Sequence, residues 1–122
     1  MEMYRVSFAS IRLLEVDLAE ITVDEGVDID LKMVEEIHLA LYSLLPDQFS
    51  LFINKKNSYS TQLDALIKFG QLKGINKIAV YAPNKMAQLS ADFSASIPSS
   101  SVLNIQVFTD PKIALAWLKQ SQ

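Results

Sequence analysis

The sequence predicts one α/β domain over residues 1–122, with a mixed β-sheet and about four helices. Two short runs rich in β-branched and aromatic residues, Phe49–Asn54 and Lys77–Ala82, flank an amphipathic stretch, Thr61–Lys73. Strand, helix and strand in this order form a parallel βαβ unit. Near the N-terminus, polar and apolar residues alternate in Tyr4–Phe8 and Leu14–Leu18, which indicates an antiparallel hairpin with one buried face. The fold class is therefore a hairpin followed by parallel strands.

The composition indicates the cellular compartment, whereas the high hydrophobic content has more than one explanation. The chain has 122 residues, of which 50% are hydrophobic, and it has no cysteine. The absence of cysteine excludes disulfides and thiol catalysis and fits the reducing cytoplasm. The sequence shows no signal peptide and no run of membrane-spanning length, so we expect a cytoplasmic protein. The hydrophobic content fits a compact core, but it also fits an apolar pocket or a self-association surface such as a homodimer contact.

Charge is unevenly distributed along the chain. The formal net charge is −3, yet the segment 15–36 holds nine acidic residues against Lys32 alone. No basic stripe interleaved with aromatic residues is present, which argues against a nucleic-acid partner. Within the segment, Glu20–Asp30 is predicted to be a solvated acidic connection. Because Gly26 follows Asp24 by two residues, the spacing of a calcium-binding loop is absent, and no metal is predicted.

Asp30 is a suitable N-cap for a helix over Leu31–Leu45, which Pro46 ends. His38, the only histidine, falls near the edge of the apolar arc of this helix. It is either a packed core residue or a general base, and no nucleophile accompanies it in sequence. The predicted apolar arc comprises Val34, Ile37, His38, Leu41, Leu44 and Leu45.

The central helix, Thr61–Lys73, carries two apolar stripes. We expect one stripe to face the sheet, and this stripe comprises Leu63, Leu66, Ile67 and Gly70. The second comprises Ala65, Phe69 and Leu72, which either pack against a neighbouring helix or line a groove for an apolar ligand. The start of this helix offers the hydroxyls of Ser58, Ser60 and Thr61. Either one of them caps the helix, or Ser58 or Ser60 serves as a phosphorylation site.

The sequence of the C-terminal third predicts two more helices and one last strand. Asn84 caps a short helix on which Met86, Leu89 and Phe93 form one apolar face. A serine-rich segment follows, and it is either a linker or a lid that carries Ile97. The last strand is predicted over residues 104–108, and a final helix begins at Asp110 and Pro111. Its expected inward-facing residues are Ile113, Ala114, Trp117 and Leu118.

No catalytic grouping emerges from the spacing of the residues. The three glycines are far apart, so there is no glycine-rich phosphate loop, and the acidic residues do not form an opposed pair on rigid elements. The chain is therefore predicted not to be an enzyme and to need no cofactor.

Several local motifs in this order are similar to those of the SpoIIAA-like family, bacterial relatives of the STAS domain. They are the run Tyr81-Ala82-Pro83, the run Val107-Phe108-Thr109-Asp110, and the segment 114–118 with sequence Ala-Leu-Ala-Trp-Leu. The resemblance covers nearly the whole chain. In anti-sigma-factor antagonists of this fold, a serine at the start of the central helix is phosphorylated and controls binding to a kinase. The corresponding turn here is residues 57–60, with Asn57 in place of the aspartate.

The family also resembles CRAL-TRIO-type lipid carriers in architecture, which implies an apolar ligand or peripheral contact with a membrane surface. The pocket walls would then be Ala65, Phe69, Leu72, Met86, Leu89 and Phe93, with Ile97 on the lid. Our first hypothesis is a non-enzymatic binding module for a nonpolar, lipid-like molecule. The alternative is a protein-interaction switch of the anti-sigma-factor-antagonist type, regulated by phosphorylation of Ser58 or Ser60.

Overall fold

The computed structural model describes residues 3–96 and 104–120, and of residues 93–96 it describes the backbone alone. A six-stranded sheet has the order β1-β2-β3-β5-β7-β8. Strands β1 to β3 are antiparallel, whereas β3, β5, β7 and β8 run parallel to one another. This confirms the predicted mixed sheet. The strands are β1 (Met3–Val6), β2 (Ala9–Glu15), β3 (Leu18–Val23), β5 (Phe49–Asn54), β7 (Ile75–Tyr81) and β8 (Ile105–Phe108).

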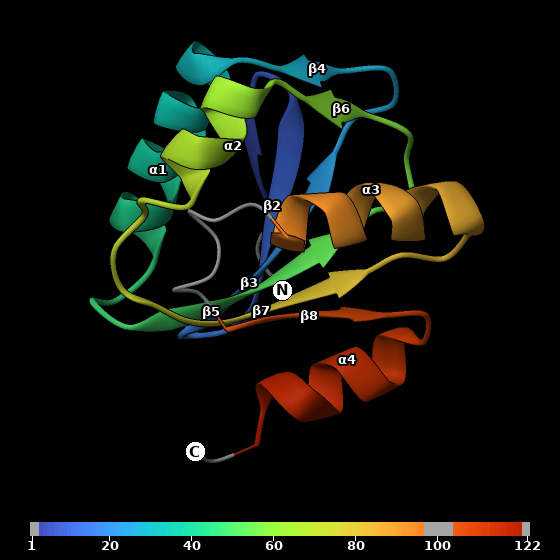
Figure 1. Ribbon diagram of the computed structural model, residues 1–122. Helices are drawn as coiled ribbons and strands as arrows, with labels where there is room; N and C mark the ends of the chain where they lie inside the picture. Colours follow the sequence, from blue (N-terminus) through green and yellow to red (C-terminus); the bar gives the residue numbers. More distant parts are fainter. Residues whose placement is uncertain (1–2, 97–103, 121–122) are drawn as a thin grey trace.

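The helices of the described residues lie on both faces of this sheet (Figure 1). Helices α1, α2 and α3 connect successive parallel strands and lie on one face, while α4 lies on the other. The predicted caps of three helices are confirmed, because Asp30, Asn84 and Asp110 each accept a backbone N–H of the first turn. The helices are α1 (Leu31–Leu44), α2 (Leu63–Phe69), α3 (Lys85–Ser96) and α4 (Pro111–Leu118).

The N-terminal hairpin was placed incorrectly by the sequence pattern. Residues 9–12, expected to connect two strands, belong to β2, and the turn lies at residues 7–8. The expected acidic connection also begins as a central strand, since β3 is almost wholly buried. The sequence pattern did not predict this strand because the strand contains Glu20, whose carboxylate is buried but paired. It accepts hydrogen bonds from Arg12 at 2.6 Å and from the Asn54 amide at 2.9 Å, so burial of the charge is compensated.

Helix α2 is shorter than predicted, and its core-facing side combines residues of both predicted stripes, since Leu66 and Gly70 of one and Phe69 of the other line the same cavity in the core. Leu63 and Ile67, expected against the sheet, are 58% and 37% exposed, whereas Ala65 is fully buried. The two stripes are equally apolar, so periodicity alone does not decide between them. On α4, Ile113 was also expected inward but is 58% exposed, since Ala114 and Leu118 fill the narrower back layer.

A separate two-stranded ribbon joins the loops that follow β3 and β5. Its strands, β4 (Asp28–Ile29) and β6 (Ser60–Thr61), are parallel, and they lie apart from the main sheet (Figure 1). Backbone hydrogen bonds of 2.9 Å run from Ser60 N to Val27 O and from Gln62 N to Ile29 O. The ribbon therefore ties together two loops at the carboxyl ends of the parallel strands. It also sets where α2 begins.

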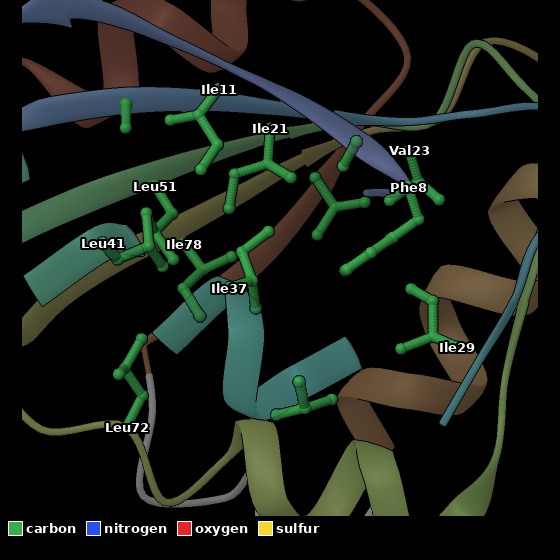
Figure 2. Packing of buried hydrophobic residues seen from close by; sticks show 14 of the residues in the cluster. Phe8, Ile11, Ile21, Val23, Ile29, Ile37, Leu41, Leu51, Leu72 and Ile78 are labelled. Carbon is green, nitrogen blue, oxygen red and sulfur yellow. The ribbon is translucent and has the colours of Figure 1, made fainter. Parts of the chain in front are cut away.

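The main core lies between the sheet and helices α1 to α3. Ile21 and Ile78 of the sheet and Ile37 of α1 point into the same layer (Figure 2). A smaller cluster on the back face joins Phe52 and Ala79 to Leu118 of α4. The largest fully buried side chains of the main core are Phe49, Ile11, Leu41, Leu51 and Val34.

Candidate functional site

The main core is not completely filled. A cavity of about 130 Å³ lies between the sheet and helices α1, α2 and α3. Phe8 and Ile29 lie at the ribbon end of this core region (Figure 2). Because the walls are dominated by branched aliphatic side chains, the space suits an apolar occupant. The aliphatic wall includes Ile21, Ile29, Val34, Ile37, Ile78 and Val80.

The polar side chains of the cavity wall come from one short segment. Among the described lining residues, those with polar side-chain atoms are Lys55, Tyr59 and Thr61. Lys55 follows β5 directly, and Thr61 belongs to β6, so the segment passes from the sheet to the ribbon. The site therefore lies at the carboxyl ends of the parallel strands, where open α/β sheets commonly carry ligands. The cavity is apolar on most sides and polar on one.

Lys55 is the charged group of this cavity. Its side chain is 8% exposed, and its Nζ lies 3.9 Å from the centre of the Tyr59 ring. Within residues 3–96 and 104–120, Lys55 makes no ion pair with a carboxylate. Burial without such a partner disfavours the ammonium, and it lowers the pKa of Lys55 to about 8. Contact with the face of an aromatic ring offsets part of this cost.

The sequence pattern did not identify Lys55 as a site residue. The sequence places it with Lys56 in a polar turn after the first strand of the βαβ unit, where either lysine could favour a phosphate on a nearby serine, and Lys56 is exposed. One signal in the sequence does separate the two lysines, because Lys55 is the first residue after a buried strand of a βαβ unit. The hydrogen-bonded pairing of β5 with β7 continues at Lys55, whose backbone N–H donates to the Tyr81 carbonyl at 2.9 Å. This bond holds the residue in the core layer.

His38 lies behind the cavity wall. Its ring is 5.6 Å from the ring of Phe69, which lines the cavity, and 6.5 Å from the ring of Tyr42. Its Nε2 is buried and has no hydrogen-bond partner among the described residues. Burial, and then the charge of Lys68, lower the pKa of His38, against an opposing effect of Glu35. The lowered pKa favours the neutral imidazole, and the ring packs beside Phe69 and Tyr42. The hydrogen bond expected of a packed core histidine is not made by Nε2 among the described residues.

The residues predicted to form pocket walls are not brought together as one set. Phe69 lines the cavity, while Ala65 and Leu72 are buried in the core and are not among its described lining residues. Met86 and Leu89 of α3 are 75% and 56% exposed. The side chain of Phe93 and the whole of Ile97 lie outside the described residues. A ligand-binding role for this set stays a prediction.

Ser58 and Ser60 lie on the ribbon segment and not at the start of α2. The N-cap of α2 is Gln62, whose side chain makes no capping hydrogen bond, so the predicted capping by these serines is wrong. Ser60 Oγ donates to Asp28 Oδ1 at 2.8 Å, and Ser58 N donates to Glu25 Oε1 at 3.1 Å. Both serines are exposed. Their immediate surroundings are acidic.

Comparisons with known proteins bear on the fold. No protein-family model matches the sequence, and no curated protein matches it either. The structure is similar to that of the Bacillus cell fate determinant SpoIIAA in its phosphorylated form, with a TM-score of 0.47 and 12% sequence identity. The similarity covers 89% of this chain and 98% of that chain. Among the described helices, none has the length and apolar character needed to cross a bilayer.

Proposed function

We propose that this chain is a non-enzymatic module that binds a small nonpolar molecule in the cavity beneath α1, α2 and α3. The observation that carries the proposal is an apolar space of about 130 Å³ within an otherwise well-packed core. In another protein, an engineered apolar cavity of about 150 Å³ stays dry and binds benzene. The cavity described here is of similar size and is also lined mainly by apolar side chains, but it is partly open and one part of its wall carries Lys55, Tyr59 and Thr61.

The size of the cavity limits the ligand. A single ring or a short aliphatic chain fits the space, whereas a lipid would leave most of its acyl chain outside. Each methylene removed from water contributes about 0.8 kcal/mol. A ligand of about six carbons therefore gains enough to bind in the micromolar to millimolar range once ordering costs are deducted. The lipid-like ligand expected from the sequence is narrowed in this way to a small molecule or the end of a chain.

Two measurements test the proposal. Native mass spectrometry after gentle purification should detect a bound small molecule, and a benzene titration followed by NMR should shift the signals of Ile37, Val80 and Ala91, which line the cavity. Ala91→Leu should abolish the benzene shifts, because the larger side chain fills the space. Ala116→Leu, on the exposed face of α4, is the matched control. Absence of both copurified ligand and benzene binding would refute the proposal.

A second function, a phosphorylation-controlled interaction switch, is favoured by the exposure of Ser58 and Ser60. A phosphate on Ser60 would face the Asp28 carboxylate that its hydroxyl now contacts at 2.8 Å. Like charges at that distance repel, so the modification would open the β4–β6 ribbon. The partner would be a regulatory protein or a kinase that distinguishes the open from the closed ribbon.

The switch has its own test. Phosphoproteomic mass spectrometry should find phosphate on Ser58 or Ser60 in cells. Pull-down of a partner by the unmodified chain should be lost in Ser58→Asp or Ser60→Asp and kept in the corresponding alanine variants. Unchanged partner binding in both aspartate variants would exclude the switch.

A further inference from the structure

The polar end of the cavity carries information about the ligand beyond its size. Lys55, Tyr59 and Thr61 form one side of the wall, and the remaining described lining residues are apolar or glycine. A purely hydrocarbon ligand would supply no anion to the Lys55 ammonium, which has no carboxylate partner among the described residues. A ligand with one anionic end would instead satisfy it. The distribution of polar groups therefore indicates a ligand with one anionic end and one apolar end.

We propose that the cavity binds a small monocarboxylate, with its carboxylate against Lys55 and its aliphatic part among the isoleucine and valine side chains. This inference rests on the proposed function, because it assigns the chemical class of the ligand to the same cavity. The charge balance supports it. One buried cation without a carboxylate partner among the described residues calls for one negative charge.

The chemistry of the wall also selects among anions. Of the described lining residues, Lys55 is the one that carries a positive charge, and Tyr59 is the other one that titrates. Burial raises the pKa of the Tyr59 phenol, so it stays neutral and is available as a hydrogen-bond donor. A phosphate dianion would bring two charges to a site with one cation. A carboxylate matches the charge and makes a strong charge-assisted hydrogen bond with an ammonium.

The cavity volume fixes the length of the aliphatic part. Because a comparable cavity holds one benzene ring, a chain of about five carbons is the suitable size. Pentanoate is therefore the probe, and pentanamide is its neutral counterpart of nearly the same shape. The two differ in charge and little else, so their affinity ratio isolates the contribution of Lys55.

The experiment compares pentanoate, pentanamide and benzene on three proteins by NMR titration at pH 7. The wild-type chain should bind pentanoate at least about tenfold more tightly than pentanamide. Lys55→Met should lose this preference while still binding pentanamide and benzene. Lys56→Met is the matched control, since Lys56 is the exposed neighbour, and it should keep the preference.

A second measurement needs no variant. As the pH is raised from 7 to 10, Lys55 loses its proton in the wild-type chain, and the preference for pentanoate should disappear. If benzene binds but pentanoate binds no more tightly than pentanamide, the carboxylate assignment is overturned. The proposed binding of a small nonpolar molecule would then still hold. If none of the three probes binds, the proposed function itself fails.

Discussion

The Lys55 Nζ lies 3.9 Å from the centre of the Tyr59 ring, and both residues line the same cavity. The contact joins the end of β5 to the segment that leads into β6. An ammonium over an aromatic face gains about 1–2 kcal/mol when it is desolvated. This gain is smaller than the cost of burying the charge, since the pKa of Lys55 still falls to about 8. Within the part of the chain that the structure describes, the Lys55 charge at the candidate site is therefore not balanced by a carboxylate.

That unbalanced charge predicts a pH dependence of stability. Burial lowers the pKa of Lys55 from 10.5 to about 8, so above about pH 8 the unfolded chain binds more protons than the folded chain. The free energy of unfolding should then rise between about pH 8 and 10, and the full cost of burial applies below that window. Lys55→Met should remove the rise and stabilise the chain at pH 7 by about 2 kcal/mol. Urea unfolding at pH 7 and pH 9.5 measures both effects, and an unchanged slope in the variant would contradict them.

A second prediction concerns the buried carboxylate of β3. Glu20 accepts hydrogen bonds from Arg12 and Asn54, and its side chain is 9% exposed. Glu20→Ala leaves both donors without their partner in a partly buried layer. We expect a loss of about 2 kcal/mol in the free energy of unfolding. Glu15→Ala, an exposed position on β2, should change it by less than about 0.5 kcal/mol. Equal effects of the two substitutions would show that the network is not stabilising.

A third prediction contrasts two glycines with similar backbone conformations. Gly74, at φ +93°, would bring a Cβ into collision with the backbone carbonyl oxygen of Asp47 and close to the Phe49 ring. Gly26, at φ +80°, has open space around it. Gly26→Ala should therefore cost about 1–2 kcal/mol from backbone strain alone. Gly74→Ala should cost at least about 2 kcal/mol more. Thermal unfolding followed by circular dichroism separates the two, and equal melting temperatures would contradict the steric argument.

The fourth prediction concerns the ribbon. Ser60→Asp places a carboxylate opposite that of Asp28 and should weaken the β4–β6 pairing, whereas Ser60→Ala removes one hydrogen bond without adding charge. Hydrogen exchange at the Ser60 and Gln62 amides, which pair across the ribbon, reports the pairing. We expect exchange to accelerate by about tenfold in the aspartate variant, and by less in the alanine variant. Equal exchange in both would show that Asp28 does not oppose a negative charge there.

The parallel half of the fold could be predicted from the sequence because each of its elements carries a local signal. Asp30 and Asp110 cap helices, and Phe49–Asn54 forms the strand expected from its composition. The antiparallel half was misplaced because Glu20 interrupts an otherwise apolar strand, and the side chains that compensate its charge are 8 and 34 residues away in sequence. Such compensation is a tertiary effect, which local patterns do not report.

The candidate site was predicted only in part for a related reason. Phe69 was expected beside a ligand and does line the cavity. The sequence pattern places Lys55 in a polar turn, because lysine is seldom buried. Its position directly after a buried strand indicates burial, but local sequence does not report which residues from other elements surround its side chain. Its environment is set by Tyr59, Ile29 and α2, which the ribbon brings together. Met86 and Leu89 follow helical periodicity, but they face solvent because α3 buries the opposite side, at Ala91.

Under the proposed function, the short β4–β6 ribbon should determine how quickly a bound molecule leaves the cavity. Its two strands are separated by about thirty residues and pair over two positions each, so it contributes little to global stability and can open by local unfolding. Ile29, Tyr59 and Thr61 move with it, and all three are part of the cavity wall. The residence time of a bound molecule should then follow substitutions in the ribbon and be nearly insensitive to those in the deep core. The proposed function therefore predicts that ligand release does not require global unfolding of the chain.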